Sequence, residues 1–262
     1  MSMFQNKSAL KQQFTAVTGC SSGEVTKWLE KSGWKLDVAI DAYLSNKTSS
    51  NTLRPDSKLV EIFESYKDND GNGDVIGIDG TLRYLEDLGV DPDNSITLVL
   101  AYFLQSPSMG VFHRDTFLES WSRTNINTID GMSQYLQNLY QTYKSDRDYF
   151  KKVYIFAFDF LMEVPGQRIL SYDLAIDYWK LLFFERQEFE DCFTRLNQWF
   201  DFATNEYKRG FSKDTWQMFF LFLEDVIKKD PVNLSAYDEM AAWPSAIDEY
   251  IEYLRENDLV SF

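Results

Sequence analysis

The residue pattern with the clearest chemical meaning is the twelve-residue run Asp68–Asp79, which reads DNDGNGDVIGID. Asp68, Asp70 and Asn72 occupy positions one, three and five, a glycine follows at position six, and Asp79 closes the run. This order matches the calcium loop of an EF-hand, in which oxygen ligands surround a hard divalent cation. Because Asp79 is shorter than the glutamate usual at position twelve, the pattern predicts either weak calcium binding or a loop that only joins two helices.

Side chains suited to covalent catalysis are scarce. The chain has one histidine, His113, and two cysteines, Cys20 and Cys192. The acids beside Cys192 in the sequence are expected to raise the pKa of its thiol and so to disfavour the reactive thiolate. Two cysteines and one histidine cannot supply the four nitrogen and sulfur ligands of a structural zinc site. We therefore expect no catalytic residue and no cofactor apart from calcium, and an enzyme with its own active site is the least favoured class.

A third pattern lies near the C-terminus, where acids and tryptophans meet at predicted helix starts. Asp214 belongs to the run SKDTW, and Asp248 follows the run AAWP, which contains Ala242. Residues 237–258 hold seven acidic side chains and one basic side chain. Ordinary helix chemistry is one explanation for these two acids. Ser212 would be the N-cap of a helix whose first turn holds Asp214, and Asp248 would likewise be a first-turn acid that the helix dipole favours. The other explanation is a surface that docks a basic partner.

Composition limits the classes of partner. With 262 residues, of which 44% are hydrophobic, the chain is expected to fold as one large domain or as a medium domain plus a small module. A net charge of −15 argues against nucleic acid and anionic membranes and favours a basic protein surface. No apolar run reaches the roughly 18 residues of a membrane helix, and no secretory signal is visible. Two cysteines suit an intracellular protein of the cytoplasm or nucleus.

The elements that must position these residues are predicted to be helices throughout. A polar stretch at 47–56, rich in helix-breaking residues, separates residues 1–46 from residues 57–262. We therefore predict an all-α protein in which a small three-helix bundle, a linker and a larger all-helical domain follow one another over these ranges. Three aromatic side chains are expected to supply most of the core of the bundle: Trp28, Trp34 and Tyr43.

Within the larger domain, apolar residues recur at helical spacing. Ile78, Leu82 and Leu85 mark one helix, and Asp91-Pro92 is predicted to open the next. Later helices are predicted over 128–143, 146–162, 172–184, 188–203, 213–229 and 245–256. The run RDTF at 114–117 resembles KDTW at 213–216. Repeated helix–loop–helix units are one explanation of this similarity, and chance is the other.

Together these features resemble the defective-in-cullin-neddylation family, in which a ubiquitin-associated (UBA)-like module precedes a potentiating-neddylation domain. The resemblance covers most of the chain and is to a fungal member. It implies a larger domain with EF-hand-like helix–loop–helix units. The motifs that carry the resemblance are Trp34–Ala39, Ile76–Gly80, Asp91–Pro92, Ala175–Trp179, Lys213–Trp216, Ala242–Pro244 and Ile247–Glu249.

This family implies a scaffold-type ligase. It would accelerate transfer of the ubiquitin-like modifier to a cullin lysine by proximity and orientation. It would bind a cullin through an acidic patch, to which Asp214, Ala242 and Asp248 correspond. It would also hold the N-terminally acetylated methionine of the neddylation conjugating enzyme in an apolar pocket. The positions that match this pocket are Ile78, Thr81, Pro92, Leu98, Leu104, Met109, Phe112, Phe160, Tyr178 and Leu181. Thr81 departs from an expected aliphatic residue, and Met109 departs from an expected polar one.

Two questions stay open at this point. UBA modules that bind ubiquitin often place Met-Gly-Phe between their first two helices, whereas this chain has Thr18-Gly19-Cys20. Binding of ubiquitin or of the ubiquitin-like modifier by the module is therefore not assured. The alternative function is a calcium-sensing, EF-hand-type adaptor that presents a groove to partner helices. A calcium titration separates the two functions, because only a sensor should change its exposed apolar surface.

Overall fold

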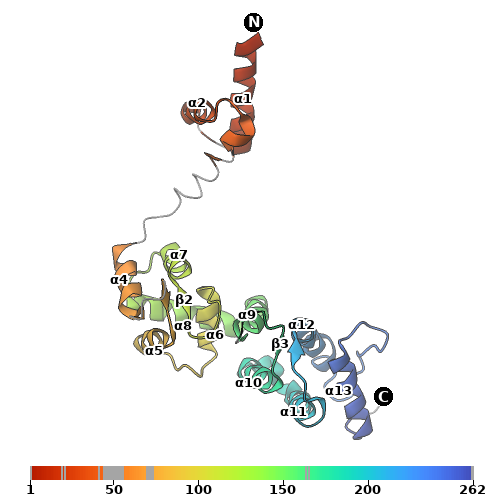
Figure 1. Cartoon of the computed structure of the whole chain (residues 1–262). Helices are drawn as coiled ribbons and strands as arrows, with labels where there is room; N and C mark the ends of the chain where they lie inside the picture. Colours follow the sequence, from red (N-terminus) through yellow and green to blue (C-terminus); the bar gives the residue numbers. More distant parts are fainter. Residues whose placement is uncertain are drawn as a thin grey trace. The chain divides into compact units, whose positions relative to one another are not determined.

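The chain divides into two compact units, Met1–Asp56 and Ser57–Phe262, in a computed structural model (Figure 1). The structure describes residues 2–18, 20, 22–40, 42–43, 56–68, 74–162, 164 and 166–260. These residues are helical apart from loops and four two-residue strands, which confirms the predicted all-α class. Of the predicted linker 47–56, only Asp56 is described, so the division into module, linker and domain stays a prediction. In the described ranges, no helix combines the length and apolar character needed to cross a membrane.

The small unit contains α1 (Ser2–Thr18), α2 (Ser22–Lys31) and further helical residues at 36–40 and 42–43. Its buried core consists of Phe14, Cys20, Val25, Leu29 and Ala39. The three aromatic side chains predicted to form this core are only partly buried and pack around it. The prediction was wrong because large rings at the edge of so small a unit keep one side in water.

The first half of the larger unit packs α4 against α5 and α7 and joins two short strands. Its elements are α4 (Ser57–Tyr66), β1 (Val75–Ile76), α5 (Ile78–Asp87), α6 (Ile96–Phe103), β2 (Phe112–His113) and α7 (Arg114–Thr124). The strands are antiparallel, with Val75 opposite His113 and Ile76 opposite Phe112. A Cβ atom on Gly80 would lie 1.9 Å from the carbonyl oxygen of Tyr66, so only glycine allows α5 to approach the end of α4 this closely.

The second half repeats this order of helix, strand and helix. After α8 (Ile129–Ser145), its elements are α9 (Arg147–Phe160), β3 (Ile169–Leu170), α10 (Tyr172–Phe183), α11 (Phe193–Phe202), β4 (Phe211–Ser212), α12 (Lys213–Phe222) and α13 (Ser245–Glu256). Strands β3 and β4 are antiparallel. The similar runs at 114–117 and 213–216 open α7 and α12, each directly after the second strand of its pair. The similarity in sequence therefore coincides with a structural repeat, although an EF-hand character of these units stays a prediction.

Three of the predicted helices differ clearly from the observed ones in their start or their geometry. The helix predicted to open at Asp91-Pro92 begins only at Ile96, after a turn in which the side chain of Asn94 accepts the amide of Ile96 at 3.0 Å. The helix predicted at 188–203 begins as a 3₁₀ helix, Gln187–Cys192, before α11. The helix predicted at 213–229 changes from α to π geometry after Phe222.

Stacked aromatic rings in the core support the start of α12. Trp216 stacks on Tyr154 and on Trp179, with ring centroids 4.8 and 5.0 Å apart. The Tyr154 hydroxyl donates to the carbonyl oxygen of Trp216 at 2.7 Å and accepts from Trp179 Nε1 at 2.9 Å. The predicted N-cap is confirmed, because the Ser212 hydroxyl accepts the amide of Thr215 at 3.1 Å. The first turn of α12 is thus held by packing, hydrogen bonds and a cap.

Candidate functional site

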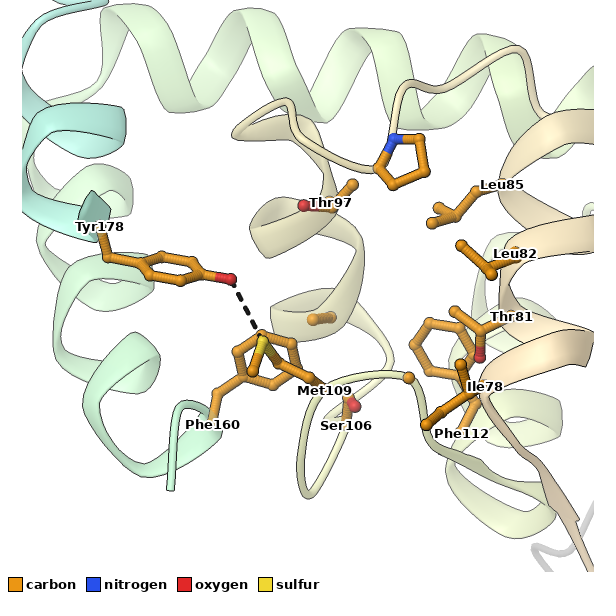
Figure 2. Close-up of a pocket in the computed structure, with 13 residues that line it drawn as sticks. Ile78, Thr81, Leu82, Leu85, Thr97, Ser106, Met109, Phe112, Phe160 and Tyr178 are labelled. Carbon is orange, nitrogen blue, oxygen red and sulfur yellow. Dashed lines mark hydrogen bonds between the residues drawn. The ribbon is translucent and has the colours of Figure 1, made fainter. Parts of the chain in front are cut away.

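A cavity of about 260 Å³ lies where α5, α6 and α10 meet, and we name it the α5–α10 cavity (Figure 2). It is lined by Ile78, Thr81, Leu82, Leu85, Pro92, Thr97, Ala101, Ser106, Met109, Gly110, Phe112, Phe160 and Tyr178. None of these side chains carries a charge. Cavities of this kind bury an apolar group and orient it with a few polar contacts.

The cavity has a buried floor and an exposed rim. Phe112 and Phe160 are buried, whereas Ile78, Leu82 and Met109 are exposed. The Ile78 side chain is 64% exposed, although it is a large aliphatic group at the first position of α5. Exposed aliphatic side chains around an apolar hollow are typical of a surface that a partner covers.

Polar groups of the lining are nearly all paired. The Tyr178 hydroxyl donates to Met109 Sδ at 3.2 Å, as Figure 2 shows. Burial is the main cause that raises the pKa of Tyr178, so its phenol stays neutral at physiological pH. The hydroxyls of Thr97 and Ser106 donate to backbone carbonyl oxygens. The buried hydroxyl of Thr81 has no partner among the residues that the structure describes.

The structure brings seven of the ten predicted pocket residues together around this cavity. They are Ile78, Thr81, Pro92, Met109, Phe112, Phe160 and Tyr178. Leu98 and Leu104 instead belong to the buried core, and Leu181 packs against that core. On α6 the cavity meets Thr97 and Ala101, which are one helical turn apart, so Leu98 faces elsewhere. Binding of a partner in the cavity is not tested by this geometry and stays a prediction.

Sequence reasoning missed six lining residues: Leu82, Leu85, Thr97, Ala101, Ser106 and Gly110. The sequence could have indicated two of them, because Leu82 and Leu85 lie on the same predicted helix face as Ile78. Gly110 has a φ of +70°. A Cβ atom there would come within 2.9 Å of Ile78 Cγ1, so the glycine keeps the rim loop against α5.

The second candidate site lies on α12, α13 and the loop between them, and α12 packs against α13. Asp214 is exposed in the first turn of α12, and Ala242 is exposed just before α13. Asp248 is half-buried in the first turn of α13 and accepts from the Tyr237 hydroxyl at 2.7 Å. We name Asp214, Asp238, Glu239, Met240, Ala242 and Asp248 together the α12–α13 surface. In the described part of the chain, no hydrogen bond or ion pair joins Asp214 directly to Ala242 or Asp248.

Some of the acids of this surface form ion pairs and others do not. Glu239 pairs with Arg255, and Glu249 pairs with Arg209. In the described part of the chain, no ion pair is formed by Asp214 or Asp238. Unpaired acids on an exposed surface create a negative potential that attracts a basic partner.

Cys192 is buried, and the predicted calcium loop is described only in part. Burial is the main cause that raises the pKa of the Cys192 thiol to about 11, and the neighbouring acids add less. The predicted direction was right, but the main cause is loss of solvent. Asp70 and Asn72 lie outside the described residues, while Asp68 is half-buried and Asp79 is exposed in the first turn of α5. Within the described ranges, no cluster of three or more histidine, cysteine or acidic residues could hold a metal.

Comparison with known proteins gives a family match within each of the two units. Residues 131–253 match the cullin-binding family, and residues 9–50 match the UBA-like domain. The chain is 36% identical to "Defective in cullin neddylation protein 1" of Candida albicans over 97% of its own length and 99% of that protein. It is also 36% identical to the Yarrowia lipolytica protein of the same name, over 91% and 93% of the two chains. These matches support a role in cullin neddylation. The chain belongs to the defective-in-cullin-neddylation family.

Proposed function

We propose that this protein promotes cullin neddylation by holding two partners at once. A cullin binds the α12–α13 surface, and the acetylated N-terminus of the neddylation conjugating enzyme enters the α5–α10 cavity. The observation that carries the proposal is the match to the cullin-binding family over residues 131–253, because this range includes Asp214, Ala242 and Asp248.

The charge of the α12–α13 surface supports a basic cullin segment as its ligand. Exposed ion pairs contribute roughly 0.2–1 kcal/mol each, so affinity must come from several contacts together. The small Ala242 side chain lets a partner approach closely, and Asp214 and Asp248 stand at the starts of two helices of the same surface. A large or basic side chain at these positions would repel the same partner.

The lining of the α5–α10 cavity supports an acetylated rather than a free N-terminus. A free terminal ammonium would enter a cavity that has no acidic side chain in its lining, and burying it unpaired costs several kcal/mol. Acetylation removes this charge. Burying the methionine side chain then contributes about 1.5–3 kcal/mol.

Acceleration in this arrangement is non-covalent. The conjugating enzyme carries the modifier as a thioester, and the acceptor lysine belongs to the cullin. Holding both on one compact unit replaces a bimolecular encounter with an intramolecular one, which can lower a barrier by roughly 7–11 kcal/mol when the geometry is ideal. The raised pKa of Cys192 fits this scheme, since the thiol has no part in it.

A reconstituted reaction with purified cullin and charged conjugating enzyme tests the proposal. We expect the protein to accelerate transfer of the modifier to the cullin, and we expect Phe112→Arg and the double variant Asp214→Lys/Ala242→Arg each to abolish the acceleration. Mixing the two variants should not restore it, because one molecule must hold both partners. Restored acceleration in the mixture would contradict the scaffold mechanism. Undiminished acceleration by either variant would show that the site altered in that variant is not needed.

A further inference from the structure

The loop that leads into α13 exposes a methionine. Met240 is 92% exposed, and the neighbouring Ala241 and Ala242 are exposed too. Single exposed apolar side chains are ordinary on protein surfaces. What distinguishes Met240 is the way the surrounding structure holds the loop that presents it.

Hydrogen bonds and an ion pair hold the loop on both sides of Met240. The amide of Met240 donates to Asp238 Oδ1 at 2.9 Å, which forms a tight turn. Glu239 pairs with Arg255 near the end of α13. The residue before Met240 is therefore tied to the helix that the loop precedes, and the amide of Met240 itself is paired.

Aromatic packing anchors the rest of the loop. The Trp243 ring lies edge-on to Phe222 of α12, with ring centroids 5.6 Å apart. It also stacks on Tyr237, at 6.4 Å, and Tyr237 donates to Asp248. The backbone that carries Met240 is thus ordered before any partner binds, which lowers the conformational entropy lost on binding.

The surroundings of Met240 indicate the chemistry of its partner. Acids stand on both sides of it in the sequence, Asp238 and Glu239 before it and Asp248 after it. A second copy of this surface or an anionic membrane would be repelled by the same charge. A complementary ligand has an apolar hollow bordered by basic side chains.

We propose that Met240 is an apolar anchor for the cullin, which inserts into such a hollow while the acids contact its basic rim. The inference rests on the proposed function, because Met240 lies two residues from Ala242 in the same surface. Affinity at interfaces is concentrated in a few buried side chains, while exposed charges contribute mainly to specificity and association rate. Methionine is suited to this role, since its flexible thioether adapts to irregular apolar surfaces.

Calorimetry with the purified cullin and the full-length protein tests the inference. We expect Met240→Ala to weaken binding about tenfold, which corresponds to about 1.4 kcal/mol. Met240→Gln, which keeps the length of the side chain but not its apolar character, should weaken binding to a similar extent. The matched control is Val232→Ala, which shortens another exposed apolar side chain of the loop between α12 and α13, 68% exposed, and should leave affinity unchanged. Thermal melts should be unchanged for all three variants.

Failure of the inference can be distinguished from failure of the proposed function. If both Met240 variants bind like the unaltered protein while Asp214→Lys/Ala242→Arg does not bind, the anchor is wrong and the docking surface stands. If the double variant binds cullin normally, the assignment of the docking surface is wrong, and the assignment of Met240 as an anchor is then wrong too. Equal weakening by Val232→Ala would also overturn the inference, as would a dimer of this chain that Met240→Ala dissociates.

Discussion

The α5–α10 cavity and the α12–α13 surface belong to one compact unit but differ in shape and chemistry. Figure 1 shows α5 and α6 towards one end of this unit and α13 at the other. The cavity is concave and has an uncharged lining. The α12–α13 surface exposes acids around the short apolar side chain of Ala242 and the methionine Met240.

This difference indicates two modes of recognition. An uncharged cavity gains affinity by removing apolar surface from water, and it discriminates against a ligand that brings an unpaired charge. An exposed acidic surface gains affinity and rate from charge complementarity, which salt screens. In the proposed function, two partners with different chemistry would therefore bind the same unit without competing for either site.

The largest effect is expected from reversing charge on the α12–α13 surface. Asp214→Lys combined with Ala242→Arg should abolish cullin binding, because it adds repulsion and a steric block where an acid and a small side chain stand. The control is Asp130→Lys, which reverses an exposed acid in the first turn of α8 and should leave binding unchanged. Calorimetry measures both affinities, and helical circular dichroism should be unaltered. Normal cullin binding by the double variant would show that the cullin docks elsewhere.

The next largest effect concerns the cavity. An acetylated twelve-residue peptide from the N-terminus of the conjugating enzyme should bind at least tenfold tighter than its free-amine counterpart, about 1.4 kcal/mol or more. Fluorescence polarisation with both peptides measures this ratio. Phe112→Arg should remove binding of the acetylated peptide, because Phe112 is 4% exposed at the floor of the cavity. Equal affinities of the two peptides would contradict recognition by an uncharged pocket.

A smaller effect is expected from salt, which should weaken binding at the α12–α13 surface more than binding in the α5–α10 cavity. Raising ionic strength from about 0.05 to about 0.5 M shortens the screening length several-fold. We expect cullin affinity to fall by roughly tenfold, whereas affinity for the acetylated peptide should change by less than about twofold. Titrations of one protein preparation at both salt concentrations make the comparison. A parallel loss at both sites would mean that charge contributes to recognition in the cavity as well.

The smallest effect is expected from calcium. Chelation should leave the stimulation of neddylation unchanged, and so should Asp68→Ala, because the shorter Asp79 closes the predicted loop poorly. Calorimetry with calcium should show weak binding or none. Loss of stimulation on chelation alone would favour the calcium-sensing alternative over the scaffold.

Sequence alone predicted what depends on local periodicity and local chemistry. Apolar residues at helical spacing predicted the helices, and Ser212 before Asp214 predicted the cap and the first-turn acid of α12. Similarity to a known family supplied the docking residues and most of the cavity residues. The confirmed part of the prediction is therefore the all-α class, the family and the local structure at the start of α12.

Only the tertiary structure decided which side chains share a surface. Leu98 and Thr97 are neighbours in α6, yet Leu98 is buried in the core and Thr97 lines the cavity. The reason is that the outline of the cavity depends on how α5, α6 and α10 pack together. The same holds for Met240, whose exposure results from the Asp238 turn, the Glu239–Arg255 pair and the packing of Trp243. Periodicity describes one helix at a time, whereas a cavity or a docking loop is a property of several elements packed together.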